Sequence, residues 1–244
     1  MKKTPIAISE SQVRSNYQRV LQRIQEAASR SGRSADLIRL IGVTKYVDAV
    51  TAGYLVSAGC LDLGESRPQF IWEKATALSS RNIRWHLIGH LQRNKAKRTL
   101  PLISTMHSLD SDRLLSQILE DVVGRESGVE LLLEVNISGD AAKTGIAISD
   151  AELLLERWME QNSNNAMAKI VGLMGMGSLN GGADQARNDF ESLRKLRDRW
   201  SVRYSLPLPE LSMGMSDDFE VAIEQGATMV RIGSILFQND GIIN

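Results

Sequence analysis

The chain has 244 residues, with 29 basic and 29 acidic side chains and a single cysteine, Cys60. One cysteine cannot form an intramolecular disulfide, which excludes a disulfide-stapled secreted scaffold and makes the reducing cytoplasm the expected location. The balanced charge argues against a nucleic-acid binder. No apolar run approaches the roughly 18 residues that a membrane span needs. We therefore expect neither nucleic acid nor a membrane as a partner.

Predicted helices and strands alternate along the chain. Residues 9–31 have apolar side chains at helical spacing, with Ser9 and Gln12 placed as a capping box. Short apolar runs then predict strands at 38–43, 60–63, 84–88, 103–107, 129–135, 169–173, 210–213 and 228–232. The stretches between them predict helices at 48–58, 68–80, 91–100, 111–124, 149–161, 184–204 and 217–225, each long enough for a right-handed crossover.

This alternation predicts an α/β fold. Eight strands alternating with helices fit a single-domain TIM-type (β/α)8 barrel over residues 1–244, with an additional N-terminal helix. A doubly wound open sheet is the structural alternative, because it is built from the same alternation. No low-complexity stretch divides the chain, which favours one domain. In a barrel the chemistry lies at the C-terminal ends of the strands, so these ends are the places to inspect.

Lys45 is the first unusual strand end. It lies two residues after Val43, at the end of a continuous apolar strand. A lysine at the mouth of a desolvated cavity is available as a nucleophile for an aldehyde, because burial disfavours its ammonium form. The alternative is a strand-end lysine that turns toward solvent.

The loops after the seventh and eighth strands combine glycine with hydroxyl side chains. Glycine lets backbone amides approach an anion closely, and barrels commonly bind phosphate at these two loops. The pair therefore predicts a phosphate cup, with two ordinary glycine-containing turns as the alternative. The cup residues are Ser212, Gly214, Met215 and Ser216 in the first loop, and Gly233 and Ser234 in the second.

Arg231 is expected to face inward, because it stands two residues before Gly233. A guanidinium there is costly to bury without an anion or a strong acceptor. An inward lysine, a phosphate cup and an inward arginine together describe a site for pyridoxal 5'-phosphate, with Lys45 forming an imine and Arg231 donating to the pyridine nitrogen. An arginine donor leaves that nitrogen largely unprotonated, so chemistry that needs a deep electron sink, such as transamination, is disfavoured.

The motifs, taken in order, resemble the YggS/PROSC family of pyridoxal phosphate homeostasis proteins. The chain departs from the family at Ser66, where the family commonly has asparagine after Gly-Glu, so a shorter hydroxyl replaces an amide. The matching segments span almost the whole chain: VTK at 43–45, LGE at 63–65 with Gln69, WHLIGHLQRNK at 85–95, VNIS at 135–138, KTG at 143–145, GLM at 172–174 and both cup loops.

The resemblance implies a barrel of the alanine-racemase N-terminal type, which is fold type III among pyridoxal phosphate proteins, with the cofactor on Lys45. It implies phosphate contacts from residues 212–216 and from Gly233-Ser234, with Arg231 near the ring nitrogen. It also implies a role in vitamin B6 and amino/keto-acid homeostasis without established turnover, with pyridoxal phosphate-dependent apo-enzymes as partners. We further expect His86 to line the mouth of the pocket.

Two enzyme functions remain as alternatives. An amino-acid racemase of this fold needs two opposed bases, and in alanine racemases the second comes from a separate C-terminal β-domain for which this chain leaves no residues. Tyr46 could in principle substitute for that base. A lysine-imine aldolase acting on a phosphorylated substrate would use Lys45 and the cup without a cofactor, but Arg231 disfavours it. Because the partner domain is missing, a monomer is expected.

Other reactive side chains point to no site. His86 and His90 are four residues apart, but Gly89 and the change from strand to helix between them remove the geometry of a metal site, so no metal is expected. Cys60 has an apolar context and no activating base, which indicates a small buried hydrophobe. The basic residues of 93–98 are too few for a nucleic-acid contact and indicate a solvated helix face.

Overall fold

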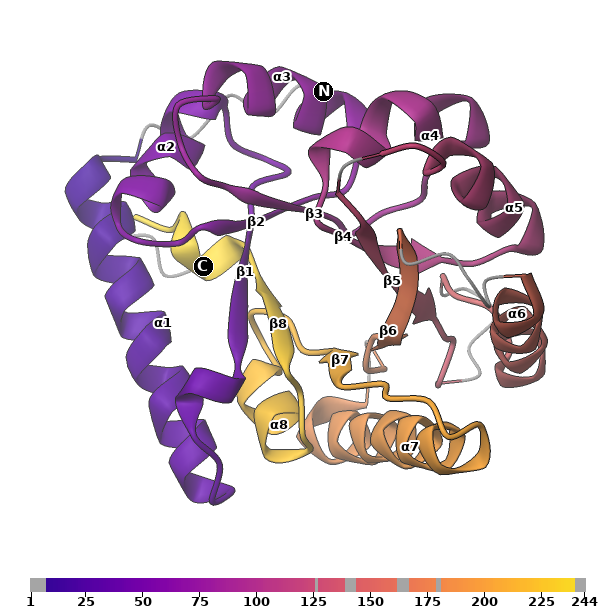
Figure 1. Cartoon of the computed structure of the whole chain (residues 1–244). Helices are drawn as coiled ribbons and strands as arrows, with labels where there is room; N and C mark the ends of the chain where they lie inside the picture. Colours follow the sequence, from indigo (N-terminus) through magenta and orange to yellow (C-terminus); the bar gives the residue numbers. More distant parts are fainter. Residues whose placement is uncertain (1–7, 126, 139–143, 162–166, 179–180, 240–244) are drawn as a thin grey trace.

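The computed structural model of the chain describes residues 8–125, 127–138, 144–161, 167–178 and 181–239. Its centre is a closed barrel of eight parallel strands in sequence order, in which the last strand pairs with the first (Figure 1). The predicted barrel is confirmed, and the alternative of an open sheet is wrong. The strands are β1 (Arg39–Val43), β2 (Asp62–Glu65), β3 (Arg84–Leu87), β4 (Thr105–Leu109), β5 (Val129–Glu134), β6 (Ala168–Met174), β7 (Glu210–Ser212) and β8 (Met229–Ile232).

Helices surround the barrel (Figure 1). They are α1 (Glu10–Arg30), α2 (Ala49–Ser57), α3 (Pro68–Ala77), α4 (Arg93–Thr99), α5 (Asp112–Asp121), α6 (Ile148–Gln161), α7 (Gly182–Arg203) and α8 (Phe219–Glu224), with short 3-10 helices η1 (Ala35–Leu37), η2 (Leu100–Leu102) and η3 (Ser234–Leu236). The additional helix α1 packs beside α2 and α8. Among the described residues, no helix is both long enough and apolar enough to cross a bilayer.

Helix α1 also holds the chain that follows β8. Its N-terminus is capped by Ser9, whose hydroxyl accepts a hydrogen bond from the amide of Gln12 at 3.2 Å. Asn16 lies on the inner face of the helix and is buried, and its side-chain amide donates to the carbonyls of Leu236 at 3.1 Å and Gln238 at 2.8 Å. These bonds satisfy a buried polar group and fix the segment that begins at Gly233, so they help to place one of the two predicted cup loops.

The barrel interior is partly apolar and partly polar. Ile41, Leu132, Met174 and Met229 form a small buried cluster that is separate from the large core between the barrel and its helices. Arg231 pairs with Ile41 across β8 and β1, so its side chain leaves the sheet on the same, inward face. The apolar cluster therefore fills only part of the barrel, and charged and polar side chains enter the remainder.

Two strands begin two residues later than the sequence predicted. Residues 60–63 and 103–107 were expected, whereas the structure has β2 from Asp62 and β4 from Thr105. Both strands also end two residues later than predicted, at Glu65 and Leu109, because Glu65 and Ser108 are polar yet buried within them. Each of these two side chains has a hydrogen-bond partner on another part of the chain, so burial does not require an apolar side chain there.

Candidate functional site

Gly214 shapes the loop after β7. Its φ is +90°, and a Cβ atom there would lie 2.5 Å from Cβ of Ala222 and 2.9 Å from Cα of Phe219. Glycine is the residue that adopts this backbone at little cost and leaves room for the start of α8. The amide of Met215 then donates to the carboxylate of Asp218 at 2.6 Å, which closes the turn. The backbone of this loop is thus folded tightly onto α8.

The two predicted cup loops lie together at the mouth of the barrel. The amide of Gly233 donates to the hydroxyl of Ser216 at 3.4 Å, and the amide of Arg231 donates to the carbonyl of Gly214 at 3.0 Å. A Cβ atom on Gly233 would lie 3.3 Å from Cβ of Val43, two residues before Lys45. The loops after β7 and β8 and the end of β1 therefore meet at one place.

Backbone amides in the first loop are available to an anion. Helix α8 begins at Phe219, two residues later than predicted, and the amides of Asp218 and Phe219 both donate to the carbonyl of Met215. The backbone amides of Ser216 and Asp217 donate no hydrogen bond to any residue that the structure describes. The arrangement provides amide and hydroxyl donors of the kind that bind phosphate.

Arg231 is buried beneath these loops, with 4% of its surface exposed. Its Nη1 donates to Ser212 Oγ at 2.7 Å, and its Nη2 donates to the carbonyl of Gly175 at 3.1 Å. Burial lowers the pKa of Arg231 to about 10, although the carboxylates of Asp218 and Glu134 oppose this shift, so the guanidinium stays charged at neutral pH. The described residues supply no further hydrogen bond, which leaves three of its five N–H groups for a ligand.

Lys45 lies in the turn after β1 and is exposed. Its Nζ lies 5.0 Å from the centroid of the Tyr46 ring, and within the described residues it makes no ion pair. The protein itself therefore does not desolvate this amine, contrary to the cavity expected from the sequence. A ligand held by the cup and by Arg231 would have to supply that burial.

A buried ion pair fixes the residue before Lys45. Nζ of Lys74 donates to Oε1 of Glu65 at 2.5 Å and to the carbonyl of Thr44 at 2.7 Å, while the hydroxyl of Thr44 donates to the same carboxylate at 2.7 Å. Lys74 was not predicted from the sequence. A signal was present, because Lys74 continues the buried stripe of Pro68 and Ile71 on α3, where an apolar residue would be expected.

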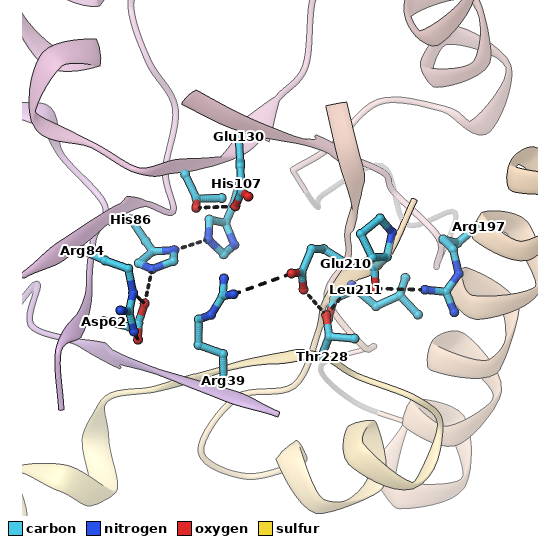
Figure 2. Close-up of polar contacts among 12 residues, drawn as sticks. Arg39, Asp62, Arg84, His86, His107, Glu130, Arg197, Glu210, Leu211 and Thr228 are labelled. Atoms are coloured by element: carbon cyan, nitrogen blue, oxygen red, sulfur yellow. Dashed lines mark hydrogen bonds and ion pairs between the residues drawn. The ribbon is translucent and has the colours of Figure 1, made fainter. Parts of the chain in front are cut away.

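Two histidines cross the barrel interior below the mouth. Nε2 of His86 lies 3.0 Å from Oδ1 of Asp62, and its Nδ1 lies 3.0 Å from Nε2 of His107 (Figure 2). Nδ1 of His107 lies 2.8 Å from Ser212 Oγ. His86 was predicted at the mouth, but it is fully buried and both its ring nitrogens are engaged. The hydroxyl of Ser212 is likewise engaged with His107 and Arg231. Asp62 and His107 were not predicted from the sequence as site residues.

The interior histidines are held in their neutral form. Burial lowers the pKa of His86, although the Asp62 carboxylate opposes the shift. Burial also lowers the pKa of His107 to well below its ordinary value, with further lowering from His86, Arg231 and Arg39. Burial alone would raise the pKa of Asp62, but hydrogen bonds from His86 and Arg84 lower it to about 2. An ionised carboxylate therefore faces two uncharged rings.

Mild acid should destabilise the protein through these two histidines. Their pKa values are lowered in the folded state. As the pH falls through the unfolded pKa of about 6.5, the unfolded chain therefore binds more protons than the folded chain, and the free energy of unfolding decreases. Between pH 7 and pH 6 the free energy of unfolding should therefore fall, by at most about 1.4 kcal/mol, the limit for two rings that both stay uncharged in the folded state; urea denaturation measures the change. Equal stability at the two pH values would contradict the assignment of neutral rings.

Cys60 behaves as the sequence analysis expected. The thiol is free and buried, and its Sγ lies 3.4 Å from the carbonyl of Asp62. Burial raises its pKa to about 12, so the nucleophilic thiolate is disfavoured. This residue is a small core side chain and takes no part in the site at the mouth.

Comparison with known proteins gives consistent matches over most of the chain. The family model of the alanine racemase N-terminal domain matches residues 8–240. A relative from Aquifex aeolicus, named Pyridoxal phosphate homeostasis protein, is 38% identical over 219 residues, which cover 90% of this chain and 94% of the relative. A crystal structure of an unknown protein from Bifidobacterium adolescentis is 32% identical, with a TM-score of 0.84 over 97% of this chain and 99% of that one. PipY of Synechococcus elongatus, solved with PLP bound, is 28% identical, with a TM-score of 0.75 over 88% of this chain and 100% of that one.

Proposed function

Since the chain belongs to the family of pyridoxal phosphate homeostasis proteins, we propose that it binds pyridoxal 5'-phosphate at the mouth of the barrel and serves vitamin B6 and amino/keto-acid balance. The observation that carries the proposal is the placement of Arg231. Its buried guanidinium has unused donors directly beneath two joined loops with free amides, next to the end of β1. PipY, which shares this fold, was solved with PLP bound.

Each part of the site has a role in the proposal. The amides of Ser216 and Asp217, with the hydroxyls of Ser216 and Ser234, hold the phosphate group, and Gly214 and Gly233 let the backbone approach it. Arg231 donates to the pyridine nitrogen. Lys45 would supply the amine for the aldehyde of the cofactor, with which it would condense with release of one water.

The proposal assigns no turnover to the protein. A racemase would need a second base, and Tyr46 is 85% exposed, with no hydrogen bond among the described residues to orient its hydroxyl. An aldolase without cofactor would leave the unused donors of the buried Arg231 without a ligand. The proposal extends to residues 1–244 as one domain, to a monomer in the cytoplasm, and to pyridoxal phosphate-dependent apo-enzymes as recipients.

The purified protein should be yellow, should bleach on borohydride reduction, and should then carry a pyridoxyl-phosphate mass on Lys45. Lys45→Ala should lose the adduct yet change the free energy of unfolding by no more than about 0.5 kcal/mol, because it removes an exposed side chain. Peptide mass spectrometry and urea denaturation measure both results. Lys97→Ala, which removes another exposed lysine, is the control and should keep the adduct.

Three outcomes would overturn parts of the proposal. A colourless protein that gains no adduct when mixed with pyridoxal phosphate would refute cofactor binding. An adduct that persists in Lys45→Ala would show that another amine carries it. Loss of the optical rotation of L-amino acids toward zero, at enzymic rates, would establish a racemase instead.

A further inference from the structure

Asp62, His86, His107, Ser212 and Arg231 form one interior chain of hydrogen bonds, and the chemistry of its ends fixes its direction. A guanidinium only donates, and an ionised carboxylate only accepts. Asp62 therefore accepts the Nε2–H of His86, to which it lies 3.0 Å away. A neutral His86 with its hydrogen on Nε2 has a bare Nδ1, which accepts the Nε2–H of His107 (Figure 2).

The hydrogen bonds nearer the mouth have the same direction. A neutral His107 with its hydrogen on Nε2 has a bare Nδ1, so the hydroxyl of Ser212 donates to it. The oxygen of Ser212 then accepts from Nη1 of Arg231. All four hydrogen bonds point from Arg231 toward Asp62, and both histidine rings have a partner on each nitrogen.

This order matters for Arg231, because a serine hydroxyl rotates unless its hydrogen and its lone pairs are both engaged. Donation to His107 turns the hydrogen of Ser212 away from the guanidinium and strengthens its oxygen as an acceptor. With the tautomers reversed, His107 would donate to Ser212, and the hydroxyl hydrogen would need an acceptor elsewhere in a fully buried place. The carboxylate of Asp62, at the start of β2, selects the first arrangement.

We propose that Asp62, His86 and His107 are positioning residues for Arg231, which orient the Ser212 hydroxyl and thereby aim the guanidinium at the ring nitrogen of the bound cofactor. The identity of that ligand rests on the proposed function, whereas the interior chain is a property of the protein without ligand. The N-terminal end of the barrel, where Arg84 also contacts Asp62, thus contributes to a ligand contact at the opposite end.

The burial cost of the interior chain supports a role beyond packing. Each buried polar group must recover the hydrogen bonds that it loses with water, and apolar side chains of similar volume usually fill such a space at equal or lower free energy. Ile41 and Met229 do fill the adjacent part of the interior in that way. A network with every member bonded holds one arrangement, which suits the orientation of a ligand-binding group.

The direction of the interior chain can be measured directly without ligand. The protein contains three histidines, so ¹⁵N-histidine NMR resolves each ring, and His90→Asn assigns the exposed one. At pH 7.5 we expect His86 and His107 both to carry hydrogen on Nε2 and none on Nδ1. A hydrogen on Nδ1 of His107 would reverse the direction at Ser212 and overturn the inference.

Two substitutions at one position test the consequence for the ligand. His107→Phe keeps a ring of similar size but removes the acceptor for Ser212, whereas His107→Asn keeps an amide oxygen near the position of Nδ1. We expect His107→Phe to bind pyridoxal phosphate roughly tenfold more weakly, with a shifted absorbance maximum, because a charge-assisted hydrogen bond loses its alignment. His107→Asn should stay within roughly threefold of the unaltered protein.

The outcomes separate this inference from the proposed function. If the unaltered protein fails to bind pyridoxal phosphate, the proposed function fails. The histidine tautomers measured by NMR then still test the direction of the interior hydrogen bonds. If the unaltered protein binds and a folded His107→Phe variant binds equally well with an unshifted spectrum, the positioning role is refuted. Should His107→Phe fail to fold, Ser212→Ala against Ser212→Thr gives the same contrast, with weaker binding expected only where the hydroxyl is lost.

Discussion

Replacing Lys74 with methionine should lower the free energy of unfolding by about 3–5 kcal/mol, because it leaves the Glu65 carboxylate buried without its counter-charge. Both side chains are almost completely buried, at 4% and 0% exposure, and the second oxygen of Glu65 already has no partner among the described residues. Methionine has nearly the length of lysine, so the loss reports the missing ammonium and not a cavity. Urea denaturation measures the change.

Two further variants separate charge from packing at Lys74. Glu65→Gln combined with Lys74→Met removes both charges and keeps an acceptor for the Thr44 hydroxyl, so most of the lost stability should return. Lys97→Met, on an exposed face of α4, should change stability by no more than about 0.5 kcal/mol. A loss below about 1 kcal/mol in Lys74→Met would mean that Glu65 is not held as a buried charge.

The loss should also reach the site, because Lys74 and Glu65 hold the carbonyl and the hydroxyl of Thr44, the residue before Lys45. Those hydrogen bonds fix the backbone at the end of β1 where it enters the mouth. A folded Lys74→Met variant should therefore form the Lys45 adduct more slowly. Reduction with borohydride at fixed times after mixing with pyridoxal phosphate measures that rate.

The sequence predicted the barrel well because several of its strands are largely apolar runs that alternate with stretches of helical periodicity. Runs such as 129–135 and 169–173 are buried on one side by the interior and on the other by helices, so composition alone marks them. The loops after β7 and β8 were also predictable, since Gly214 serves a backbone conformation that few other residues adopt. The local sequence pattern was sufficient to predict these strands and loops.

The polar half of the interior could not be predicted in the same way. His107 and Ser212 are bonded although they lie 105 residues apart in sequence, and each looks locally like a polar residue at a strand end. A polar side chain is buried at low cost only when it has a hydrogen-bond partner. Here that partner lies on another strand, so the local sequence does not reveal it. The later ends of β2 and β4, and the prediction of His86 at the mouth, have this one cause.

Gly214→Ala should be the most damaging single change within the cup. A left-handed φ of +90° costs a residue with a Cβ about 1 kcal/mol, and the new atom would lie 2.9 Å from the backbone of Phe219 and 2.5 Å from Ala222. Overpacking against atoms that cannot swing away adds about 1–3 kcal/mol, so we expect a total loss of about 2–4 kcal/mol in urea denaturation.

The matched control for Gly214→Ala is Gly124→Ala. Gly124 also has a positive φ, +76°, but a Cβ atom there meets nothing within 4 Å, so only the backbone cost of about 1 kcal/mol applies. The two variants should differ in cofactor binding as well, because relief of the clash at Gly214 requires the loop to move away from α8. That movement would separate the carbonyl of Gly214 from the amide of Arg231 and open the contact between Ser216 and Gly233. If Gly214→Ala binds pyridoxal phosphate as tightly as Gly124→Ala, the phosphate does not lie in this loop.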